Sequence, residues 1–159
     1  MSDSTYYVET QMMIRKPVTV VFEAFVDPEM TRNFWFTKSN GRLIEGKSVQ
    51  WEWEMYNVAL HVEVKKVVID KQIIIEWGTP STVVEFLFTP IDDQRTYVQI
   101  KNYGFIETGD ALVAAIKDST GGFTTVLDGL KAFLEYGINL NLIADKFPKE
   151  FISHGNAET

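Results

Sequence analysis

The sequence contains no cysteine and only two histidines among its 159 residues. Without cysteine, the chain forms neither disulfides nor thiolate metal sites, which fits a reducing cytoplasm. His61 and His154 lie far apart in the sequence, so we predict neither a metal site nor another cofactor. The chain also lacks a run of roughly 20 apolar residues, the length of a membrane span, and its first five residues are unlike a signal peptide. We therefore expect a cytoplasmic protein with no membrane span.

Basic residues are scarce as well, because 15 Lys and Arg stand against 22 Asp and Glu and give a formal net charge of −7. Nucleic-acid binding needs a basic surface that neutralises phosphates, so we expect no nucleic-acid partner. A chain of this length fits a single domain, which we place at residues 1–152. We predict a disordered tail at 153–159, and the sequence leaves a homodimer open.

Apolar and polar residues alternate over much of the chain, a period of two that predicts strands. Two short helices are predicted after the first strand, the first beginning at Pro17 and the second capped by Asp27. Short turns between the later strands predict an antiparallel meander. The predicted strands are 6–15, 38–44, 48–55, 58–64, 73–77, 82–88 and 96–102.

Helical spacing replaces alternation in the last third of the chain. A modest helix is predicted over 111–117, capped by Asp110, and a long one over 120–138. Gly121 and Gly122 are expected either to interrupt this stretch or to allow a close approach to the sheet. The long helix carries an apolar stripe that must be buried against the aromatic face of the strands. That stripe comprises Phe123, Val126, Leu127, Leu130, Phe133, Leu134, Gly137 and Ile138.

A sheet that curves around one helix tends to leave a hollow, and aromatic residues gather where this hollow is expected. Aromatic side chains fill ordinary cores, but small-molecule sites are also apolar, with few polar anchors. Core filling and pocket lining therefore both stay open, and Asn102, Thr10 and Tyr103 are candidate anchors. The candidate ligand-binding residues are Trp35, Trp51, Trp53, Trp77, Phe86, Asn102, Phe123 and Leu127.

Motifs with a known chemistry are weak in this sequence. Residues 41–48 fit the phosphate-binding pattern G-x-x-x-x-G-K-S, but the residues after them alternate as a strand and supply no helix N-terminus. The one candidate general base, His61, is predicted on an outward strand face. Glu52 and Glu54 are predicted on the face opposite the tryptophans, unless the register of that strand is shifted by one residue. Glu85 is the third carboxylate that an acid–base mechanism could use.

Several stretches resemble one known family. The residues from Ile14 to Glu29, followed by Trp35, are similar to the opening of START-like (SRPBCC) helix-grip domains, and more narrowly to homologues of the activator of the heat-shock-protein-90 ATPase. Ile73–Trp77, Arg95–Phe105 and Gly122–Glu135 agree with the same family, which usually has Trp at the position of Phe123. The resemblance covers about residues 6–140 and implies an α+β helix-grip fold. In that fold a curved antiparallel sheet of six to seven strands wraps around a long C-terminal helix, and two short helices follow the first strand.

The resemblance also implies a range of functions. Related domains include lipid and hormone carriers, polyketide cyclases and ring-hydroxylating oxygenases, and the last of these need iron ligands that this sequence lacks. The eukaryotic chaperone activator carries a further N-terminal domain that this chain is not expected to contain. We therefore predict non-enzymatic binding of a small apolar or aromatic molecule between sheet and helix. The alternatives are a cyclase- or hydrolase-like enzyme using the same cavity, and a modulator of a chaperone ATPase.

Overall fold

The computed structural model describes residues 6–151 and contains one sheet of seven antiparallel strands. The spatial order β1-β7-β6-β5-β4-β3-β2 makes the first and last strands neighbours, and it confirms the predicted α+β meander. The strands are β1 (Tyr7–Ile14), β2 (Lys38–Ser39), β3 (Ser48–Trp53), β4 (Val58–Val68), β5 (Gln72–Trp77), β6 (Thr82–Asp92) and β7 (Arg95–Tyr103). The helices are α1 (Val18–Val26), α2 (Pro28–Thr31), α3 (Gly109–Tyr136) and α4 (Leu142–Lys146), with 3₁₀ turns η1 (Glu54–Tyr56) and η2 (Lys149–Phe151).

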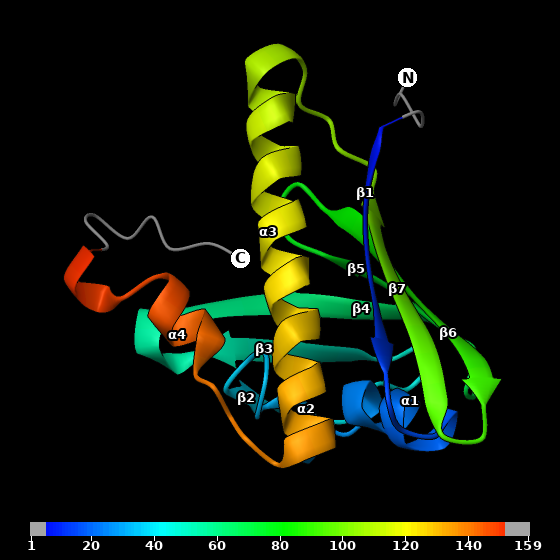
Figure 1. Cartoon of the computed structure of the whole chain (residues 1–159). Coiled ribbons are helices and arrows are strands. Elements are labelled where there is room, and N and C mark those ends of the chain that lie inside the picture. Colours follow the sequence, from blue (N-terminus) through cyan, green and yellow to red (C-terminus); the bar gives the residue numbers. More distant parts are fainter. Residues whose placement is uncertain (1–5, 152–159) are drawn as a thin grey trace.

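The sheet curves around α3, while α1 and α2 lie near the C-terminal end of that helix and α4 lies beside it (Figure 1). The central residues of the predicted stripe, from Phe123 to Leu130, are buried against the sheet. Ile138 lies beyond the end of the helix and is half exposed, so its predicted place on the stripe is wrong. The described residues contain no helix with both the length and the apolar character that crossing a bilayer requires.

The helical region is one continuous α3, where the sequence predicted two helices. The helix begins after Thr108, so Asp110 lies in its first turn and does not cap it. A glycine inside a helix costs about 1 kcal/mol relative to alanine. Tertiary packing offsets this term here, because Gly122 is buried and a Cβ on Gly121 would meet Lys146 Nζ of α4 at 3.4 Å. The glycines therefore do not interrupt the helix, and Gly121 lies beside α4.

The strand predicted at 38–44 is only two residues long in the structure. Side chains take over the hydrogen bonds that a longer strand would supply. The Gln50 N–H donates to Asn40 Oδ1 at 2.9 Å, and Ser39 Oγ donates to the Gly41 carbonyl at 2.9 Å. Asn and Ser side chains compete with the backbone in this way, which ends the strand early.

β6 is longer than predicted, because it continues past Phe88 to Asp92. The register with β7 shifts between Pro90 and Asp92. Proline has no N–H to donate and is tolerated in strands at such irregular positions. The sequence predicted that the strand would end before Pro90, and this prediction is wrong.

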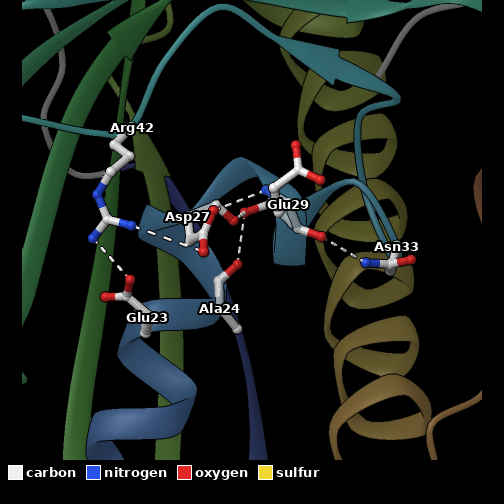
Figure 2. Close-up of polar contacts among 7 residues, drawn as sticks. Glu23, Ala24, Asp27, Glu29, Asn33 and Arg42 are labelled. Carbon is white, nitrogen blue, oxygen red and sulfur yellow. Dashed lines mark hydrogen bonds and ion pairs between the residues drawn. The ribbon is translucent and has the colours of Figure 1, made fainter.

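The junction between α1 and α2 is fixed by polar contacts (Figure 2). Asp27 Oδ1 accepts from the Glu29 N–H at 3.0 Å, which confirms Asp27 as the cap of α2. Arg42 reaches both Glu23 at 2.8 Å and Asp27 at 3.9 Å. Asn33 Nδ2 donates to the Glu29 carbonyl at 2.9 Å. These contacts set the chain direction that carries the following aromatic residues, Phe34, Trp35 and Phe36, into the core.

The C-terminal half of α3 is fastened to β1. Lys131 Nζ donates to the Met13 carbonyl at 3.1 Å, and the Arg15 N–H donates to Glu135 Oε2 at 2.7 Å. Burial raises the pKa of the Glu135 carboxyl, but hydrogen bonds from Lys131 and from the Arg15 backbone outweigh that effect and hold the pKa below its ordinary value. The carboxylate is therefore ionised at neutral pH and joins the last turns of α3 to the edge of the sheet.

Candidate ligand-binding cavity

A cavity of about 510 Å³ lies beside the N-terminal half of α3. Its volume falls within the range of about 300–1,000 Å³ that is usual for small-molecule sites. Its walls come from the sheet, the segment that follows α2, the connection between β7 and α3, α3 itself and α4. The lining residues are Trp35, Trp77, Asn102, Phe105, Glu107, Ala111, Ala114, Ala115, Asp118, Ser119, Gly122, Phe123, Val126 and Ile143.

Three aromatic rings form the inner wall of the cavity. The ring centroids of Trp35, Trp77 and Phe123 are each 5.8 Å from the other two. Trp35 and Phe123 are each only 4% exposed, whereas Trp77 is half-buried. The three rings come from elements far apart in the sequence, and they meet only because the sheet curves around α3. An apolar guest would find an aromatic wall here, in which the Trp35 ring meets the other two edge to face.

Four of the eight predicted ligand-binding residues line the cavity: Trp35, Trp77, Asn102 and Phe123. The other four lie in the surrounding core and are each at most 3% exposed, namely Trp51, Trp53, Phe86 and Leu127. Trp51 packs against Trp35 with ring centroids 4.8 Å apart. Alternation and helical spacing predict which face a side chain occupies, but not whether the cavity reaches that depth. The ligand-binding role of these residues stays a prediction.

The helix wall is made of small residues, none of which the sequence analysis assigned to a ligand site. Ala111, Ala114, Ala115, Ser119 and Gly122 all face the cavity. Their spacing of three and four residues places them on one side of α3. These small side chains leave space between helix and sheet. In the following turns of α3, larger side chains fill the corresponding space. This run of small residues is the signal in the sequence that could have located the cavity.

Asn102 is the buried polar residue of the cavity wall. Its Nδ2 donates to Thr82 Oγ1 at 3.0 Å and to the Val83 carbonyl at 2.8 Å, and its Oδ1 accepts from Ser119 Oγ at 2.8 Å. Both amide donors are therefore used within the protein. The side chain joins β6, β7 and α3, and it fixes the distance between helix and sheet at the cavity.

The other two candidate anchors do not line the cavity. The Tyr103 hydroxyl donates to Glu85 at 3.4 Å on the opposite face of the sheet. Burial and the nearby Glu85 charge raise the pKa of Tyr103. Thr10 is buried, and its Oγ1 has no hydrogen-bond partner among residues 6–151.

Two carboxylates line the cavity, Glu107 before α3 and Asp118 within it. Within the described part of the chain, neither has a hydrogen-bond partner or a cation within 4.0 Å. Burial raises the pKa of Asp118, and the nearby Lys146 ammonium lowers it by a smaller amount. The cavity is thus apolar at its inner wall and acidic among its polar groups.

The residues considered for catalysis lie elsewhere. Glu54 is exposed, and Glu52 is half-buried on the face of β3 opposite the buried tryptophans, which confirms the predicted alternation. Glu85 accepts from Gln72 Nε2 at 2.6 Å on the outer face. His61 is exposed and contacts Glu63. None of these side chains lines the cavity.

The remaining sequence motif is structural. Residues 41–48 lead into β3 and not into a helix, which confirms the strand that was predicted after this motif. The described residues hold no group of three or more His, Cys, Asp or Glu side chains placed to bind a metal ion. His154, the polar first five residues and the predicted tail at 153–159 lie outside the described residues.

Solved structures share this architecture. A protein from Staphylococcus saprophyticus superposes with a TM-score of 0.76 at 28% identity, over 85% of this chain and 96% of that one. An Aha1 dimer from Colwellia psychrerythraea gives 0.69 at 16% identity, over 84% and 98%. An HSP90 activator from Plasmodium falciparum gives 0.62 at 15% identity, over 82% and 96%. The comparison with curated proteins finds no match.

A seven-stranded antiparallel sheet around one long helix, with two short helices after the first strand, defines a START-like (SRPBCC) helix-grip protein. The sequence model of the family described as "Activator of Hsp90 ATPase homolog 1-like protein" matches residues 15–135. The chain belongs to this family, and the resemblance drawn from the sequence is confirmed. Fold alone does not determine function in such a family.

Proposed function

We propose that the protein binds a small, largely apolar molecule in the cavity between α3 and the sheet, without catalysing a reaction on it. The observation that carries this proposal is the wall formed by Trp35, Trp77 and Phe123 beside about 510 Å³ of space. A protein interior normally packs at the density of an organic crystal. A space of this size beside three rings therefore favours a guest over simple core filling.

The expected affinity follows from the area that a guest would bury. Burial of roughly 400 Å² of apolar surface yields about 10 kcal/mol. Association removes about 4 kcal/mol or more of this through lost translational and rotational freedom. The remainder of about 6 kcal/mol corresponds to a dissociation constant of roughly 40 µM, which is strong enough to measure by calorimetry.

A cavity-filling substitution tests the proposal. Ala115 lines the cavity, whereas Val113 lies on the same helix, outside the cavity and 56% exposed. We expect the wild-type protein and V113F to bind an apolar probe such as 2-naphthalenemethanol in isothermal titration calorimetry, and A115F to lose binding at least tenfold. Circular dichroism of each variant checks that it is folded. Absence of binding to the wild-type protein, or equal binding by A115F and V113F, would refute the proposal.

A second candidate function is modulation of a chaperone ATPase. The family match and the HSP90 activator from Plasmodium falciparum support it, as does the acidic balance of the chain, since charge complementarity steers association with a basic partner. The test is the ATPase rate of the host's own Hsp90-type chaperone with and without saturating protein. An unchanged rate would exclude this function.

Two broader expectations belong to the same proposal. We place the protein in the cytoplasm, which the absence of cysteine supports. A homodimer is supported by the Aha1 dimer from Colwellia psychrerythraea. Light scattering on the purified chain would give twice the monomer mass if the dimer forms and the monomer mass if it does not.

A further inference from the structure

We infer that the cavity selects its ligand by charge, and that it accepts an apolar molecule carrying an amine or another cationic head in preference to a neutral or anionic one. This inference rests on the proposed function of the cavity as a ligand site. It concerns a property that the fold does not determine, namely the sign of the charge at the polar end of the guest.

The charged side chains that line the cavity are all acidic. Glu107 and Asp118 contribute carboxylates, and no Lys, Arg or His of residues 6–151 belongs to the lining. The other polar side chains of the wall, Asn102 and Ser119, are already bonded to each other. A fatty acid or an aromatic carboxylate would therefore bring its negative charge to a wall that carries the same sign.

Asp118 is the cavity-lining carboxylate that the helix dipole does not explain. An acidic residue near a helix N-terminus is favoured by the helix dipole, and this accounts for Asp110 in the first turn of α3 and for Glu107 just before it. Asp118 lies in the third turn, beyond the reach of that effect. Its immediate neighbours on the cavity face are Ala114, Ala115 and Gly122, which offer it no hydrogen-bonding side chain.

The electrostatic surroundings of Asp118, whose side chain is exposed at the cavity, support the same conclusion. Partial desolvation raises the pKa of this carboxyl, and no cation of residues 6–151 lies within 4.0 Å of it. A cation from a guest would supply the missing partner. A charged group that lacks a partner in the free protein and gains one on binding contributes to affinity and to selectivity together.

Two nearby features make the surroundings of the cavity less negative, namely the Lys146 ammonium and the N-terminus of α3. The Lys146 ammonium is close enough to lower the pKa of Asp118. However, it does not line the cavity, and it lies more than 4.0 Å from either carboxylate, because the ion pairs of residues 6–151 do not include it. The positive end of α3 is faced by Glu107 and Asp110. One ammonium against two lining carboxylates leaves the wall acidic.

The test compares three probes that share one apolar body. These are 2-naphthylmethylamine, 2-naphthalenemethanol and 2-naphthoate, which are cationic, neutral and anionic at neutral pH. Calorimetry at low ionic strength is expected to show the amine binding about fivefold more tightly than the alcohol, the upper end for a partly exposed ion pair, and the acid binding more weakly than both. Salt at about 0.5 M should reduce the difference between amine and alcohol through screening.

Two variants separate a local effect from the net charge of the protein. D118N is expected to reduce the preference for the amine over the alcohol, because the amine loses the carboxylate that it faces. D93N removes the same unit of charge from the exposed turn between β6 and β7, outside the cavity lining, and it should keep the full preference for the amine.

The outcomes distinguish this inference from the proposed function. If the alcohol binds and the amine binds no better, or if D118N leaves the preference unchanged, the charge selection is refuted and the apolar cavity remains. Tightest binding of 2-naphthoate would also overturn the inference and assign the dominant charge to Lys146. If none of the three probes binds, the proposed function itself fails.

Discussion

The side chain of Asn102 illustrates how single residues define the cavity. Its amide bridges β6, β7 and α3 through Thr82, Val83 and Ser119, and it is only 3% exposed. A buried amide that is fully bonded fixes the geometry of its neighbours, whereas loss of the amide would leave buried groups without partners. Asn102 therefore has a structural role in addition to any contact with a guest.

Replacement of Asn102 by Ala is expected to lower the free energy of unfolding by about 1–3 kcal/mol, because the Val83 carbonyl and the Thr82 hydroxyl lose their donor. S119A removes a single hydrogen bond and should have the smaller effect, about 1 kcal/mol. Urea denaturation followed by circular dichroism measures both. A loss in N102A no larger than that in S119A would contradict this role.

The raised pKa of Asp118 predicts how the free energy of unfolding depends on pH. Because its pKa is raised in the folded state, the ionised carboxyl opposes folding above that pKa, and this penalty is absent below the ordinary value of 3.8. D118N should therefore be more stable than the wild-type protein at neutral pH, and the two should converge in acid. The difference stays within about 0.5 kcal/mol, since the side chain is exposed and its charge is screened.

Carbon-detected NMR titration measures the Asp118 carboxyl directly. We expect its midpoint above 3.8 in the free protein and a downward shift when 2-naphthylmethylamine is bound, because a nearby cation favours the ionised form. A midpoint at or below 3.8 in the free protein would show that the carboxyl is well solvated.

At the scale of elements, α3 combines two modes of packing along one helix. Gly129 allows closest approach, since a Cβ there would lie 3.1 Å from Phe34 Cβ and 3.3 Å from the Phe34 carbonyl. Gly121 instead faces the flexible end of Lys146 at 3.4 Å. The same residue type is therefore required by packing at one position and not at the other.

These two glycines predict opposite effects of the same substitution. G121A should raise the free energy of unfolding by about 0.5–1 kcal/mol, because alanine is the better helix former and the lysine ammonium can move aside. G129A should lower it by about 1–3 kcal/mol through overpacking against Phe34. Chemical denaturation of both variants measures these changes. If the free energy of unfolding changes with the same sign in both, the difference in packing between the two glycines is refuted.

The sequence predicted the elements well where one physical effect decides them. Alternation in β3 and the cap at Asp27 are local patterns, and both are present in the structure. The single α3 and the short β2 were missed, because each depends on distant partners: Lys146 for Gly121, and Gln50 for Asn40. Propensity is overridden by tertiary contacts in such cases.

At the scale of the whole molecule, the cavity follows from the way α3 crosses the curved sheet (Figure 1). The aromatic surplus in the sequence indicated a hollow near Trp35, Trp77 and Phe123, and these rings do line it. The helix wall and the carboxylates were missed, because alanines and an isolated Asp118 carry no distinctive pattern until the path of α3 is known. Deeper residues such as Trp51 belong to the closed core.

The fastening of α3 to β1 through Lys131 and Glu135 has a mechanical consequence. The C-terminal half of α3 is held by an ionic and hydrogen-bonded contact to β1, whereas the half that borders the cavity is held to the sheet by the Ser119–Asn102 hydrogen bond beside open space. Amide hydrogen exchange should therefore be faster in residues 112–120 than in 126–134, since weakly packed segments open locally. Addition of 2-naphthalenemethanol should slow exchange in the first segment alone. Uniform protection along α3 would mean that a guest enters the cavity without local opening of the N-terminal half of this helix.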